Sequence, residues 1–89
     1  MHSPDYSEKD FRQAAAWVLR RLRKKRGVSQ EQVAEAIGRN RQYLTKLEGG
    51  YYTPGPYLLA QFADYYSMQE GELMDRIVER ARYYAKRHR

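Results

Sequence analysis

The sequence predicts an all-α protein that forms one compact five-helix domain over residues 1–89. Three observations predict this fold class. Apolar residues recur at helical spacing along the chain, capping residues and glycines mark the ends of the helical segments, and the loops between them are short. No internal repeat or long linker divides the chain, whose 89 residues suffice for a single small domain.

The first predicted helix runs from about Ser7 to Lys25. Ser7 and Asp10 have the spacing of a capping box, in which each side chain bonds the backbone of the other residue. Gly27 is expected to end the helix in a left-handed conformation. The buried stripe of this helix is predicted to contain Phe11, Ala15, Val18, Leu19 and Leu22.

Two short helices joined by a tight turn are predicted between Ser29 and Gly50. Ser29 and Gln32 repeat the capping pattern at the start of the first, and Gly38 closes it. Asn40 is the predicted N-cap of the second. The inward residues of this pair are expected to be Val33, Ala34, Ile37, Leu44 and Leu47.

A fourth helix is predicted from Pro56 to about Tyr66, since proline suits the first helical position. Its apolar face is expected to contain Leu59, Phe62, Ala63 and Tyr66. A fifth helix starts at about Glu70 and continues into the basic tail.

The fifth helix carries more apolar surface than one packing stripe requires. Leu73 and Ile77 are expected to close the core. We expect the rest of the band to form a two-fold dimer interface, which consists of Met74, Val78, Ala81 and Tyr84. The alternative is intramolecular, with Phe11, Ala14 and Trp17 of the first helix covering the same band.

Positive charge is concentrated in the middle of the chain. The formal net charge is +6, and nine Lys and Arg residues stand against two Glu residues between positions 20 and 46. This excess coincides with the predicted pair of short helices. It favours a polyanionic partner such as nucleic acid.

Several other classes of protein are poorly supported. The chain has no cysteine and only two histidines, so neither a disulfide nor a metal site is expected. No catalytic motif, cofactor motif or small-molecule site is evident, and we expect no enzyme. Residues 1–11 do not resemble a signal peptide, and no segment has the roughly 20 apolar residues that span a membrane. A cytoplasmic, nucleoid-associated protein is expected.

Four segments of the chain, in order, resemble the lambda-repressor-like helix-turn-helix domain, also called the Cro/C1-type or XRE family. They are LRKKRGVSQEQVAEAIG, NRQYLTKLEGG, TPGPYLLAQFADYY and GELM. The resemblance covers about residues 19–75 and leaves 76–89 as a C-terminal helix extension and basic tail. It implies a DNA-binding transcriptional regulator that binds a palindromic operator as a homodimer. Small members of the family include restriction-modification controller proteins, phage repressors and antitoxins. An antitoxin is the alternative, with another protein as its main partner and DNA binding for autoregulation.

The resemblance makes the third helix, about residues 40–48, the recognition helix. Its outward side chains match the chemistry of base edges, because Arg pairs with guanine, Gln with adenine, and the Thr methyl with the thymine methyl. The expected base-contacting residues are Arg41, Gln42, Thr45 and Lys46. The expected phosphate-contacting residues are Gln30, Arg39, Asn40, Tyr43, Tyr51 and Tyr52. Arg23 and Glu48 occupy the positions of a structural salt bridge in the family.

Three of these residues have alternative roles. Tyr43 is equally well explained as a partly buried structural residue, and Tyr51 and Tyr52 as loop aromatics that pack on prolines. Arg39 departs from the family, which has an apolar residue there to fill the turn. Its aliphatic stem is expected to cover the core while the charged head reaches solvent.

Overall fold

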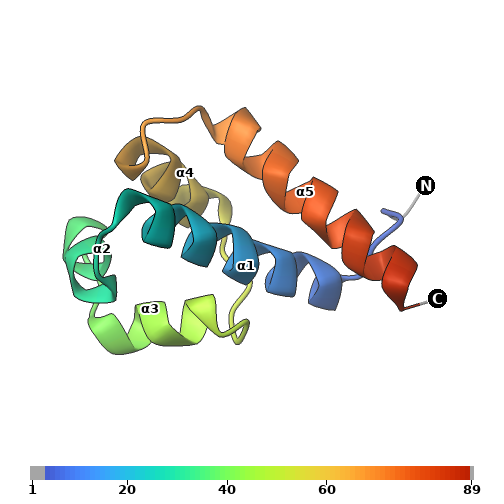
Figure 1. Cartoon of the computed structure of the whole chain (residues 1–89), viewed down its shortest axis with the longest axis horizontal. Coiled ribbons are helices and arrows are strands. Elements are labelled where there is room, and N and C mark those ends of the chain that lie inside the picture. The colour runs from blue at the N-terminus through green and yellow to red at the C-terminus, as the bar shows by residue number, and fades with distance from the viewer. Residues whose placement is uncertain (1–3, 89) are drawn as a thin grey trace.

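Five α-helices form the described part of the computed structural model, residues 4–88, in which no residue is in a strand (Figure 1). The helices are α1 (Glu8–Arg26), α2 (Gln30–Ala36), α3 (Arg41–Glu48), α4 (Pro56–Tyr65) and α5 (Glu70–Arg87). The predicted all-α, five-helix fold is confirmed. The first three residues of the segment compared with a signal peptide, and the last residue of the basic tail, lie outside the described residues.

The helix ends follow the capping residues of the sequence. The amides of Ser7 and Asp10 each donate to the other's side chain at 3.0 Å, which completes the capping box of α1. Ser29 forms the same kind of box with Gln32 at the start of α2. Gly27 ends α1 with a φ of 74°, a left-handed conformation that glycine adopts without steric cost.

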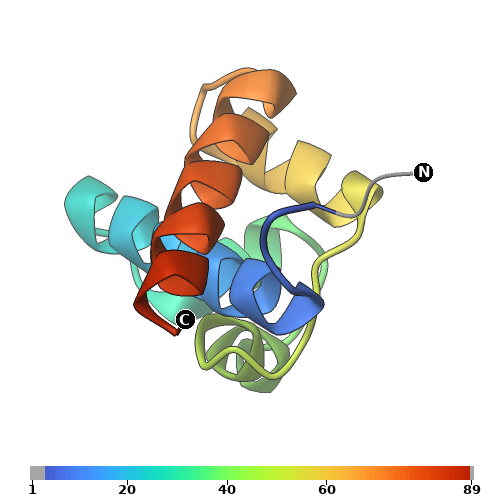
Figure 2. The ribbon, with the colours of Figure 1, turned by 90° about the vertical axis from the view of Figure 1, so that its right-hand side faces the viewer.

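Helix α1 is the central element of the fold. It packs on α3 on one side and along α5 on the other, and Figure 2 shows α5 crossing it. Its alanines allow the close approach of neighbouring helices, because their side chains are short. The largest fully buried side chains of the core come from all five helices and are Leu19, Val33, Leu44, Leu47, Phe62, Leu73 and Ile77.

In α4 the buried face is rotated slightly from the predicted one. Leu58 is buried and Leu59 is only half-buried. Leu58, Phe62 and Tyr66 lie four residues apart and therefore share one face of the helix.

The dimer interface expected on α5 needs one correction. Ala81 is 0% exposed in the single chain, because α1 packs against this part of α5, and it is therefore not available to a second copy. Tyr84 is half-buried and packs against the core. This half of the band is therefore packed within the chain. Met74, which is 41% exposed, and half-buried Val78 still reach the surface.

The capping box of α1 should make stability depend on acid pH. The backbone amide of Ser7 donates to the Asp10 carboxylate and lowers its pKa below the ordinary 3.8. The pKa of Asp10 is therefore lower in the folded protein than in the unfolded chain. The stabilisation from ionised Asp10 is fully present at pH values above the unfolded-state pKa, and it is lost as the pH falls through the folded-state pKa. We expect Asp10→Asn to lower the Tm at neutral pH. The Tm of this variant should also fall less steeply than that of the wild type below about pH 4, as measured by circular dichroism. Asp64→Asn, at an exposed carboxylate, is the control, and identical pH profiles for both variants would contradict this role.

Candidate nucleic-acid interface

Helices α2 and α3 are joined by a sharp reversal at Gly38. Its φ of 73° lies in the left-handed region, where a side chain would be strained. The amide of Arg39 then donates to the Ala34 carbonyl at 2.8 Å, which closes the turn. Val33 of α2 and Leu44 and Leu47 of α3 are buried beneath this reversal. The two helices therefore form one rigid unit on the surface of α1.

The residues predicted to contact bases lie on the outward face of α3. All four are exposed, whereas Leu44 and Leu47 on the opposite face are fully buried. In Figure 1, α3 lies along one edge of the molecule, and no other helix covers its outer side. The structure thus brings together, on one exposed helix face, Arg41, Gln42, Thr45 and Lys46.

The C-terminal end of α3 is fixed by the carboxylate of Glu48, which is only 3% exposed. Arg23 of α1 binds it in a two-point contact, with Nε 2.8 Å from Oε2 and Nη2 3.0 Å from Oε1. This contact raises the pKa of Arg23 above its ordinary value. Arg20, one turn earlier on α1, donates to the Glu48 carbonyl at 2.9 Å. Two arginines of α1 therefore hold the end of α3.

Gln30 extends this network to the exposed face of α3. Its Nε2 donates to Oε1 of Glu48 at 3.1 Å, and its Oε1 lies 2.8 Å from the hydroxyl of Thr45. The Thr45 hydroxyl also lies 3.0 Å from the Arg41 carbonyl. Both ends of the Gln30 amide thus have protein partners, and the residue positions Thr45. The sequence predicted Gln30 only as a phosphate contact and gave no sign of this link.

An aromatic row flanks the start of α3. The guanidinium of Arg39 lies 4.6 Å from the ring centre of Tyr43, and Tyr43 stacks on Tyr52 with centroids 5.2 Å apart. Arg39 therefore lies on an aromatic face at the surface, and it is exposed. Tyr43 is half-buried, so its ring has a packing role, and within residues 4–88 its hydroxyl has no hydrogen-bond partner.

The two remaining candidates differ in how far they are engaged. The Asn40 side-chain oxygen accepts from the Tyr43 amide at 2.8 Å and caps α3, which leaves only its side-chain NH₂ group for a phosphate. Tyr51 is 74% exposed, and its ring lies against Gly49. A Cβ on Gly49 would come within 3.2 Å of that ring, so the glycine permits this packing.

Residues 4–88 contain no cluster of three or more metal-ligating side chains, and none of their helices is both long and apolar enough to cross a membrane.

Comparisons with known proteins place this geometry among regulators. The family model described as a helix-turn-helix domain matches residues 14–77. A crystal structure of the clp gene regulator ClgR from Corynebacterium glutamicum is 24% identical, with a TM-score of 0.78 over 88% of this chain and 83% of that one. A second ClgR structure is 26% identical, with a TM-score of 0.70 over 78% of this chain and 90% of that one. The hypothetical transcription factor NHTF from Neisseria is 25% identical, with a TM-score of 0.67 over 76% of this chain and 78% of that one. No curated protein matches the sequence.

The Arg23–Glu48 contact should contribute strongly to stability. The two side chains are 13% and 4% exposed, so removing one leaves the other buried without its partner, at a cost of about 3–5 kcal/mol. A double-mutant cycle with Arg23→Met and Glu48→Gln, measured by chemical denaturation, should give a coupling energy above about 1 kcal/mol. The matched control is Arg76–Glu72, a pair of similar length (3.0 Å) in which both side chains are 51% exposed, and for which we expect under about 0.5 kcal/mol. Equal coupling in the two cycles would refute the special role of Glu48.

Proposed function

Since the chain belongs to the family of helix-turn-helix domains, we propose that it is a sequence-specific transcriptional regulator that binds a palindromic operator as a homodimer. The family and the similarity to ClgR and NHTF support a DNA-binding regulator of transcription. The observation that carries the proposal is the exposed polar face of α3, held from behind by the buried Glu48 network.

Three side chains on this face are free to bind bases. Within residues 4–88, no side-chain hydrogen bond or ion pair engages Arg41, Gln42 or Lys46. Arg and Gln each present two polar groups that match guanine and adenine edges in the major groove. Helix α3 has eight residues and is thus about 12 Å long, close to the width of that groove. Thr45, oriented by Gln30, keeps its methyl group for a thymine.

Residues around α3 are assigned to the DNA backbone. Arg39 and the hydroxyls of Tyr43 and Tyr52 lie beside the start of α3, where a helix inserted in the groove meets the flanking phosphates. The NH₂ group of Asn40 adds a donor at the start of α3, and exposed Tyr51, whose ring lies against Gly49, adds one just past its end. Gln30 is instead assigned to positioning, because its amide is already engaged.

Two copies are proposed because one short helix reads only a few base pairs. A two-fold dimer places the two α3 helices in successive major grooves, about 34 Å apart. Met74 and Val78 lie four residues apart on α5 and reach the surface, so we assign the contact to them. Ala81 is excluded by its burial.

Replacing the proposed base readers should change sequence preference. We expect Arg41→Ala and Gln42→Ala each to lose roughly 1–3 kcal/mol of discrimination at one base pair per half-site. The measurement is a panel of affinities for single-base variants of the preferred duplex, at fixed salt. Lys86→Ala, which removes an exposed charge near the end of α5, should weaken binding evenly and keep the preference profile. Unchanged profiles for both α3 variants would show that α3 does not read the bases.

A charge on the remaining surface of α5 should disrupt assembly. We expect Val78→Glu to weaken the pairing of two copies on a symmetric operator more than tenfold, because it places an unpaired charge in the contact. Gln69→Glu adds the same charge at the exposed start of α5 and should have little effect. Sedimentation with and without DNA gives the stoichiometry, and circular dichroism verifies folding. A Val78→Glu protein that still pairs normally would place the dimer contact elsewhere, and a wild type that stays single on the operator would refute the dimer.

A further inference from the structure

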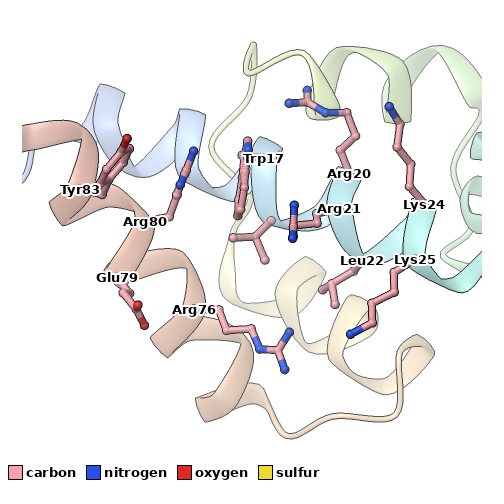
Figure 3. Close-up of a pocket in the computed structure, with 11 residues that line it drawn as sticks. Trp17, Arg20, Arg21, Leu22, Lys24, Lys25, Arg76, Glu79, Arg80 and Tyr83 are labelled. Atoms are coloured by element: carbon pink, nitrogen blue, oxygen red, sulfur yellow. The ribbon is translucent and has the colours of Figure 1, made fainter. Parts of the chain in front are cut away.

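A basic cleft of about 820 Å³ lies between α1 and α5 (Figure 3). Six of the residues that line it are cationic and only one, Glu79, is acidic. The cationic residues are Arg20, Arg21, Lys24, Lys25, Arg76 and Arg80. This volume is in the range of sites for small organic ligands.

One wall of the cleft is a stack of alternating aromatic and guanidinium groups. The Arg80 guanidinium lies 3.8 Å from the ring centre of Trp17 and 4.6 Å from that of Tyr83. Arg21 lies 5.1 Å from the Trp17 ring. Figure 3 shows Arg80 between Tyr83 and Trp17. Stacked guanidinium groups keep their edges available as planar, multi-point donors to phosphate.

The positive charge of the cleft is largely uncompensated. Within the described chain, Arg21, Lys24, Lys25 and Arg80 have no ion pair, and the buried Nε of Arg80 has no hydrogen-bond partner. Arg76 is the exception, since it pairs with Glu72 at 3.0 Å. Clustered cations repel one another, and a partly desolvated guanidinium without a partner is unfavourable. An anion bound in the cleft would relieve both effects.

The cleft is separate from the proposed DNA-reading face. Helix α1 packs on both α3 and α5 and lies between them (Figure 1). A second copy of the chain is a poor occupant because its net charge is also positive, at +6. A flat phosphate backbone would not use the concave shape or the aromatic wall. A small ligand with several phosphates and a planar ring system matches the shape, the charge and the aromatic groups together.

We propose that the cleft between α1 and α5 binds a nucleoside polyphosphate. The phosphates are bound by Lys24, Lys25 and Arg21, and the base lies against exposed Tyr83 and the stacked guanidinium groups. Arg20 lines the cleft and also donates to the Glu48 carbonyl at the end of α3. A ligand that draws Arg20 away therefore changes the support of α3 and, if the proposed function holds, the affinity for DNA.

The binding test uses the full chain without DNA, so its outcome does not depend on the proposed function. Trp17 is the only tryptophan and lines the cleft, so its fluorescence reports occupancy directly. ATP, inorganic tripolyphosphate and poly-glutamate are titrated in turn, and calorimetry gives the stoichiometry. We expect ATP to bind saturably at one per chain, to change Trp17 emission, and to bind more tightly than tripolyphosphate.

Matched double variants locate the site. Arg21→Gln with Lys25→Gln should weaken ATP binding about tenfold or more, and both residues are exposed, so the fold should be retained. Lys9→Gln with Lys86→Gln removes the same charge from exposed positions outside the cleft and should change ATP affinity far less. Circular dichroism verifies that both variants fold.

Four results would overturn the proposal. The first is the absence of saturable ATP binding at low salt, and the second is equal weakening in the two double variants, which would mean diffuse charge attraction. The third is tighter binding of poly-glutamate than of ATP, which would identify an acidic protein segment as the occupant. The fourth is unchanged ATP affinity in the cleft variant together with reduced affinity for duplex DNA, which would assign the cations to the DNA backbone.

Discussion

The buried carboxylate of Glu48 makes the contacts on which the geometry of the α2–α3 pair depends. It lies at the end of α3, and it accepts from Arg23 of α1 and Gln30 of α2. Three helices therefore meet at one charged group, whose charge is balanced by Arg23. Because Gln30 also contacts Thr45, the same network reaches the exposed face of α3. The exposed side chains of a short helix can be placed reproducibly only if the backbone beneath them is fixed, and this network fixes it.

Local signals explain why so much of the fold was predictable. Helix starts are determined by capping contacts between residues three positions apart, and such pairs can be recognised from sequence spacing. These contacts are made by Ser7 with Asp10, by Ser29 with Gln32, and by Asn40. Gly27 and Gly38 end helices because their positive φ values suit glycine. The resemblance to a known family added the one long-range pair, Arg23 with Glu48, which local spacing alone does not indicate.

Most of the features that were missed depend on how separate helices and loops pack, which local spacing does not give. The Gln30–Thr45 contact joins positions on two helices, and the Arg39–Tyr43–Tyr52 row forms only after the turn and loop are folded. Ala81 was assigned to the dimer interface because helical spacing shows which residues share an apolar face but not which element packs against that face. In the structure α1 packs there. The basic cleft was not predicted because its walls come from α1 and α5, whose lining residues are about 60 positions apart in the sequence.

Selection of bound sites from random duplex DNA tests most directly whether two α3 helices read DNA, each from one rigidly supported face. If they do, the wild-type chain enriches two inverted half-sites whose centres are about 34 Å apart, one helical turn of DNA. Enrichment of a single half-site would contradict the paired arrangement. Recovery of sequences with no common motif would contradict base reading by α3 itself.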